Sequence, residues 1–245
     1  MSETTPQPET ARPLGLGPRF VGILTAPRQT FASVVAHPRW LLMALLVVVL
    51  TGGAQLWFQS TEVGKQVTLD ATIRQIESMG VTVSDEMYEQ TRQGIMNPSP
   101  ARLAFGGIAM LVFPPIIWAI LAGVAYLVFG VFTGGNATFR QVYAVVVHSS
   151  VVGAVGALFT TPLNYVREAT SATNLAVFLP FLTEGSFFAR LAGMVDLFIV
   201  WWLAVLSIGI AVAYGKKKSG GIALVVFGIY ALIAIAIAAF QAARS

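Results

Sequence analysis

Five long apolar windows constrain this chain more than any other feature. They lie at residues 40–58, 104–132, 142–163, 193–214 and 222–240. About 20 apolar residues in a helix cross a hydrocarbon core about 30 Å thick. The windows lack the alternating pattern of a barrel strand, so helices must pair their backbone amides within lipid. The sequence therefore predicts an all-α fold, a polytopic membrane helix bundle with five transmembrane helices and short interfacial helices.

The composition of the chain excludes a soluble domain of this size. Of its 245 residues, 56% are hydrophobic and 11% are charged, and the mean hydropathy is +0.75. A soluble fold could not bury that much apolar surface. The net charge of +4 requires no nucleic acid, because the basic residues fall at the window edges, where anionic headgroups lie. We expect the lipid bilayer and other membrane proteins as partners, with a homo-oligomer possible.

Outside the windows, the chain divides into a leader and one long loop. Residues 1–17 are rich in Pro and polar side chains, which predicts a disordered leader, and residues 18–245 form one five-span membrane domain. In the loop at about residues 59–100, Ser84 is a helix start, whereas Gly80 and Asn97 precede breaks. This pattern predicts two short amphipathic helices. Pro27 similarly begins a short interfacial helix with Phe31 on its apolar face.

Basic residues are distributed unevenly between the two sides of the predicted bundle. Eight of the fifteen fall on the side of the N-terminus, namely Arg12, Arg19, Arg28, Arg39, Arg140, Lys216, Lys217 and Lys218. Because cytoplasmic loops of membrane proteins carry the excess of Lys and Arg, the N-terminus is predicted to be cytoplasmic. Five spans then put the C-terminus outside. The candidate cytoplasmic contact residues are Arg28, Arg39, Arg140, Lys216, Lys217 and Lys218.

Signals of catalysis and of cofactor binding are missing from the sequence. The chain has no Cys, and its two His residues, His37 and His148, are too far apart in the predicted topology for a paired zinc site. It contains no H-E-x-x-H, G-x-S-x-G, phosphate-binding lysine loop or dinucleotide glycine pattern. The sequence therefore predicts a protein that is not an enzyme and uses no cofactor or metal.

Asp196 precedes a long uncharged run and lies near the outer end of its span. On matching helical rises, Thr160, Thr161 and Asn164 fall at the same depth in the third span. Intramembrane acids usually have hydrogen-bonding partners, so a structural anchor between the two spans is the first interpretation. A functional carboxylate is the second.

His148 lies about two turns, roughly 10 Å, inside the third span. By the same depth argument, Tyr126, Ser207 and Tyr230 fall at a similar level. A neutral imidazole bonded to a hydroxyl group and a proton relay are the two interpretations. In the second span, Pro114 and Pro115 interrupt a window that is longer than the bilayer is thick, so a kink or a strong tilt is expected.

Several motifs occur in an order that resembles a known family. They are F-x-x-x-x-x-x-P-R-x-T-F from Phe20, then P-x-W, GGNATFRQVYAVVVHSS, NLAVFLP and VDLFIVWWLAVLSIGIAV. In this order the chain resembles the Yip family of Ypt/Rab-interacting membrane proteins, in the style of its short bacterial members, from Phe20 to Phe240. The resemblance implies five helices, a cytoplasmic N-terminus, work in membrane organisation or trafficking through protein partners, and residence in a bacterial inner membrane. The leader is shorter than the GTPase-contacting regions of eukaryotic members, so Rab binding is not carried over.

Two functions follow from these observations. The first is a non-enzymatic scaffold or adapter that contacts partners through the N-terminal interfacial helix and the basic turns. The alternative is a small-molecule or ion transporter or channel that uses the levels of His148 and Asp196. A transporter needs a continuous polar path between those two depths, whereas a scaffold needs only a dry bundle with isolated polar groups.

Overall fold

The structure, a computed structural model, describes residues 14–131, 134–169, 173–183 and 185–243. The described residues are helical apart from turns and one isolated bridge between Asn174 and Asp196. The elements are α1 Leu16–Thr25, α2 Pro27–Ala36, α3 Leu41–Ser60, α4 Glu62–Ser78, α5 Asp85–Met96, α6 Pro100–Tyr126, the π-helical turn η1 Leu127–Val131, α7 Phe139–Ser149, α8 Val151–Arg167, the 3₁₀ turn η2 Leu175–Phe178, α9 Phe187–Met194, α10 Leu197–Ala213 and α11 Gly220–Ala242.

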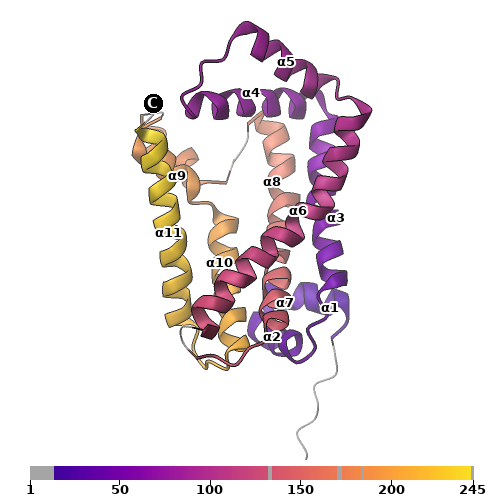
Figure 1. The fold of residues 1–245 in the computed structure, drawn as a ribbon, viewed down its shortest axis with the longest axis vertical. Helices are drawn as coiled ribbons and strands as arrows, with labels where there is room; N and C mark the ends of the chain where they lie inside the picture. The colour runs from indigo at the N-terminus through magenta and orange to yellow at the C-terminus, as the bar shows by residue number, and fades with distance from the viewer. Residues whose placement is uncertain (1–13, 132–133, 170–172, 184, 244–245) are drawn as a thin grey trace, which may run out of the picture.

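The apolar segments connect the two ends of the bundle, and α6 crosses it obliquely (Figure 1). Four are long and apolar enough to cross a membrane, at Leu41–Ser60, Pro100–Val131, Phe139–Arg167 and Gly220–Ala242. The fifth, α10, is a shorter apolar helix of 17 residues. The predicted all-α membrane bundle is therefore confirmed.

The predicted fourth span was wrong at its start. Instead of one helix from residue 193, α9 ends at Met194 and α10 begins at Leu197. The two residues between them pair with Asn174 and the start of η2, where the Leu175 amide donates to the Val195 carbonyl at 2.8 Å. At about 1.5 Å per residue, α10 spans roughly 25 Å, which is less than a hydrocarbon core about 30 Å thick.

The third predicted span forms the centre of the bundle. Helices α7 and α8 follow one another across Ser150, and every residue from Val142 to Ser149 is buried. In the most apolar window of this span 72% of the residues are buried, against 17% for the spans at α6 and α11. The last two therefore present most of their surface to lipid or to partners.

At one end of the bundle, α1 and α2 pack beneath the spans (Figure 1). Helix α1 begins at Leu16, so the last two residues of the predicted disordered leader, 16 and 17, are helical. Residues 1–13 of that leader lie outside the described residues. Helix α2 forms where it was predicted, but Phe31 and Val34 are fully buried in the main core. Its apolar face therefore packs on protein and not on lipid.

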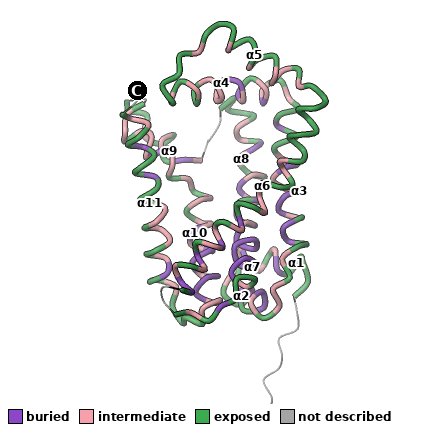
Figure 2. The backbone as a smooth tube through the Cα atoms, viewed as in Figure 1, coloured by how far each residue is buried: buried purple, intermediate pink, exposed green. Residues whose placement is uncertain are grey.

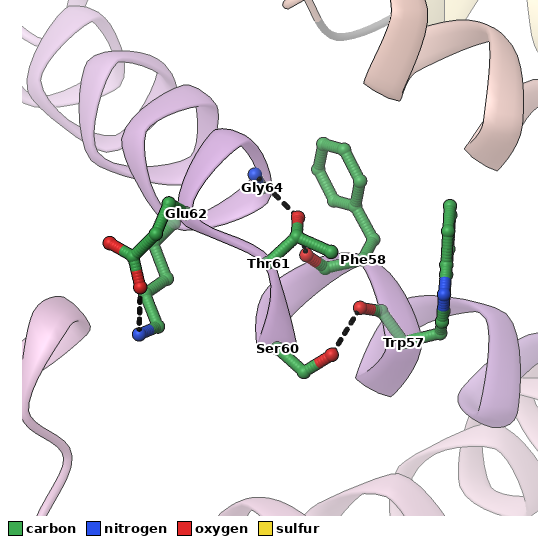
Figure 3. A network of polar contacts seen from close by, with 7 residues as sticks. Trp57, Phe58, Ser60, Thr61, Glu62 and Gly64 are labelled. Carbon is green, nitrogen blue, oxygen red and sulfur yellow. Dashed lines mark hydrogen bonds and ion pairs between the residues drawn. The ribbon is translucent and has the colours of Figure 1, made fainter.

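At the other end, α4 lies across the bundle and α5 lies above it (Figure 1). Both predicted loop helices are present, and Ser84 caps α5 by accepting a hydrogen bond from the Met87 amide at 3.2 Å. The turn into α4 is fixed by Thr61, whose hydroxyl donates to the Phe58 carbonyl at 2.7 Å and accepts from the Gly64 amide at 2.9 Å (Figure 3). The sharp turn thus begins within one turn of the end of α3.

Buried residues concentrate at the end that holds α1 and α2 (Figure 2). The main core joins Ile23 and Phe31 to α7 and to Ile210 of α10. Gly209 allows this approach, because a Cβ atom there would lie 2.5 Å from Val145 and 2.9 Å from the Phe31 ring. By contrast, α5 buries no residue.

Candidate functional site

Two cavities open at the end of the bundle that α4 covers. The first, which we name the cap cavity, has a volume of about 460 Å³ and lies between α3, α4 and α8. The second, the Asp196 cavity, has a volume of about 300 Å³ and is bounded by α8, Thr173 and the start of α10. Asn164 lines both. The two cavities therefore adjoin at the C-terminal half of α8.

Asp196 is the N-terminal cap of α10. One carboxylate oxygen, Oδ1, accepts hydrogen bonds from the amides of Phe198 at 2.8 Å and Ile199 at 3.2 Å, and the Thr173 hydroxyl donates to Oδ2. A carboxylate at this position pairs amides that the helix itself leaves free and faces the positive end of its dipole. The position of Asp196 before the uncharged run therefore marks the first turn of the helix.

The three α8 residues predicted at the depth of Asp196 lie beside the cavities. Thr160 and Asn164 line the Asp196 cavity, and Thr161 lines the cap cavity. However, the hydrogen bonds of the Asp196 carboxylate go to α10 and to Thr173, not to α8. Sequence reasoning missed Thr173, because no local pattern links it to a helix start 23 residues away.

His148 lies in the closed interior of the bundle and is fully buried. Its Nδ1 lies 2.7 Å from the Ala144 carbonyl. Since a carbonyl oxygen only accepts, Nδ1 carries the proton and Nε2 presents a lone pair, which has no hydrogen-bond partner among the described residues. His148 lines neither cavity.

The other residues predicted at the level of His148 bond elsewhere. The Ser207 hydroxyl donates to the Leu203 carbonyl of its own helix at 2.7 Å, and the Tyr126 ring packs edge-on against Phe139. The Tyr230 hydroxyl donates to the Met194 carbonyl at 2.5 Å. Tyr230 therefore reaches the junction of α9 and α10 beside Asp196, not the level of His148, which corrects the predicted depth.

Pro114 and Pro115 both lie inside α6, which continues through them as a helix. The Tyr143 hydroxyl donates to the Pro115 carbonyl at 3.5 Å. Helix α6 runs obliquely across the bundle (Figure 1). The proline pair therefore lies where the second span crosses the central helix α7.

The opposite end of the bundle is positively charged. Residues 14–40, 134–141 and 214–221 contain no acidic residue, and their basic residues are Arg19, Arg28, Arg39, Arg140, Lys216, Lys217 and Lys218. We name this surface the basic end. The described acids are in α4, α5, Glu168 and Asp196, all at the end that α4 covers, which we name the cap end. The described acids are therefore confined to the cap end, where basic residues such as Lys65 and Arg74 also lie, whereas the basic end carries basic residues alone.

Two arginines fix the helices of the basic end. Arg28 donates to the Lys216 carbonyl at 2.5 Å, which ties α2 to the turn before α11. Arg19 is only 4% exposed and donates to the carbonyls of Arg39 at 3.2 Å and His37 at 3.3 Å. Burial lowers the pKa of the Arg19 guanidinium, and the positive charge of Arg39 lowers it further. The group still remains charged at physiological pH.

The comparison with known families covers almost the whole bundle. The Yip1 domain matches residues 21–240, from α1 to the last turns of α11. The chain belongs to the Yip1 family. No curated protein and no solved structure gives a match to it. Together, the Yip1 domain and the apolar helices identify an integral membrane protein of this family.

Proposed function

We propose that this Yip1-family protein is a non-enzymatic scaffold or adapter that organises other membrane proteins. The observation that carries the proposal is the basic end, with seven basic side chains and no acid in its described segments. Such a surface attracts acidic segments of partner proteins as well as anionic headgroups. By the positive-inside rule, the basic end faces the cytoplasm. The C-terminus then lies on the outer side. The membrane of residence in this proposal is a bacterial inner membrane.

The packing around His148 supports this proposal over a transporter. A transport path would have to join the Asp196 cavity to the interior of the bundle at His148. The cap cavity stays at the cap end, and the Asp196 cavity reaches along α8 only to Gly153; the fully buried Val151 and Val152 lie between it and His148. A bundle with a packed interior at this level can present a rigid surface to partners, including a second copy of the chain.

Site-specific crosslinking in native membranes tests the scaffold proposal. We expect a photo-reactive residue at Arg140 or Lys217 to crosslink to proteins, and one at Glu86 of α5, the control at the cap end, to do so much less. With the photo-reactive residue at Arg140, exchanging Lys216, Lys217 and Lys218 for Glu should remove the protein adducts, because it reverses the attracting charge. Protein adducts that form equally from Glu86, or adducts to lipid alone at every position, would overturn the proposal.

A further inference from the structure

The cap cavity has the size and construction of a small-molecule site. Its volume of about 460 Å³ falls within the range of roughly 300–1,000 Å³ typical of ligand pockets. Its walls come from α3, α4 and α8, three helices that are far apart in the sequence, and the Thr61 turn holds α4 over it. The shape of the cavity is therefore set by the fold and not by one loop.

The polar part of the wall is uncharged. Gln55, Gln75 and Thr161 line the cavity with Asn164, and no charged side chain does so. Amides and hydroxyls both donate and accept hydrogen bonds. An anionic group would find no basic side chain here, and a cation would find no carboxylate. The wall therefore fits a neutral ligand with many hydrogen-bonding groups.

Thr161 presents a hydroxyl to the cavity. Its side chain is only 8% exposed, and its hydroxyl makes no hydrogen bond to the described part of the chain. Because the hydroxyl lies at the cavity wall, a ligand in the cavity can bond to it. The side chains of Gln55 on α3 and Gln75 on α4, which are both exposed, also make no hydrogen bond to the described residues. Three groups thus present free hydrogen-bonding capacity to one space.

The rest of the wall and its surroundings give the depth of the site. Phe58, Ala71, Ile76 and Met79 supply apolar surface. Close by, the rings of Trp57 on α3 and Tyr165 on α8 lie 5.6 Å apart. Trp and Tyr concentrate at the membrane–water interface, so the cavity lies at the level of lipid headgroups.

We propose that the cap cavity binds an uncharged, polyhydroxylated group, the sugar headgroup of a glycolipid, with Thr161, Gln55 and Gln75 bonding to its hydroxyls and Phe58 contacting its apolar face. The same chemistry is offered by a free sugar, and the experiment separates the two sources. This inference is independent of the scaffold proposal, because it concerns the opposite end of the bundle.

The test uses the full chain in phosphatidylcholine nanodiscs that contain monoglucosyl diacylglycerol as the probe, with binding measured by native mass spectrometry. We expect saturable retention of the glucosyl lipid and none of diacylglycerol, which lacks the sugar, or of phosphatidylglycerol, which is anionic. Thr161→Val, which keeps the shape and removes the hydroxyl, should weaken binding about fivefold to tenfold. Retention of all three lipids alike, or a preference for phosphatidylglycerol, would overturn the proposal.

Thr160→Val is the matched control, because its neighbouring hydroxyl lines the Asp196 cavity instead. It should leave glucosyl-lipid binding unchanged. Without probe, Thr161→Val should melt at nearly the same temperature as the wild type, since the hydroxyl that it removes bonds to no described residue. If the two variants weaken binding equally, or if Thr161→Val leaves binding intact, the site assignment is wrong. Competition by free glucose at millimolar concentration would assign a soluble sugar as the source, and its failure would assign the lipid.

Discussion

The basic end and the cap end of this bundle are built in different ways. At the basic end, α1, α2, α7 and α10 bring together large, fully buried side chains such as Ile23, Phe31 and Ile210. Among the largest fully buried side chains of the described residues, only Leu69 comes from the cap helices. The cap end instead holds the cap cavity and the described acids, and the Asp196 cavity reaches from there along α8 to Gly153. Packing energy is thus concentrated at one end, while the other end keeps open space.

The strongest test of this difference removes a core side chain from the basic end. Phe31→Ala deletes a fully buried ring that lies against Gly209 in the main core, so we expect a loss of about 3–5 kcal/mol in the free energy of unfolding. The measurement is denaturant unfolding in nanodiscs. Phe105→Ala on α6, where the ring is 69% exposed, is the control and should change stability by less than about 0.5 kcal/mol. Equal losses in both variants would remove the contrast between core and surface.

At the cap end, the most sensitive position is the turn into α4. A Cβ atom at Gly64 would lie 1.9 Å from the Phe58 carbonyl oxygen, a backbone atom that cannot rotate away. Gly64→Ala should therefore cost about 1–3 kcal/mol and loosen α4 from the bundle. The measurement is the rate of limited proteolysis between α4 and α5, together with denaturant unfolding. The control is Gly53→Ala on α3, where a Cβ meets nothing within 4 Å. It should leave the proteolysis rate and the free energy of unfolding unchanged or improved. A similar loss of stability in this control would point to helix propensity and not to the turn.

The start of α10 should respond to the loss of its cap and not to the loss of charge. Asp196→Leu removes the acceptor of the Phe198 and Ile199 amides and of the Thr173 hydroxyl, and should cost about 0.5–2 kcal/mol. Asn caps a helix about as well as Asp, so Asp196→Asn should stay within about 0.5 kcal/mol of the wild type. Thermal unfolding of both variants in nanodiscs distinguishes them. A loss in Asp196→Asn as large as that in Asp196→Leu would show that the charge itself stabilises this end.

The sequence predicted the features that depend on neighbouring residues. The apolar windows, the Ser84 cap and the breaks at Gly80 and Asn97 all follow from local pattern, and each is present in the structure. The late start of α10 was not predictable, because it depends on pairing with the segment at Asn174, about 20 residues away. The inward face of α2 was missed for another reason: an apolar stripe that includes Phe31 suits lipid and protein equally well. The cavities depend on how α4 lies over α8, which no local pattern encodes.

The smallest effect on the fold is expected where the basic end meets the solvent. Lys216, Lys217 and Lys218 are exposed, so exchanging all three for Glu should change the free energy of unfolding by less than about 0.5 kcal/mol per site. The exchange leaves four basic residues with three new acids at that end. Because Lys and Arg next to the spans set the orientation, a fraction of the molecules should then insert in the reverse direction.

In intact wild-type cells whose outer membrane has been permeabilised, an external protease should cut between α4 and α5 and leave a tag before α1 untouched. The variant should show cleavage of the tag in the inverted fraction. An unchanged protease pattern in the variant would show that Arg19, Arg28, Arg39 and Arg140 suffice to fix the orientation, and cleavage of the wild-type tag would reverse the proposed topology.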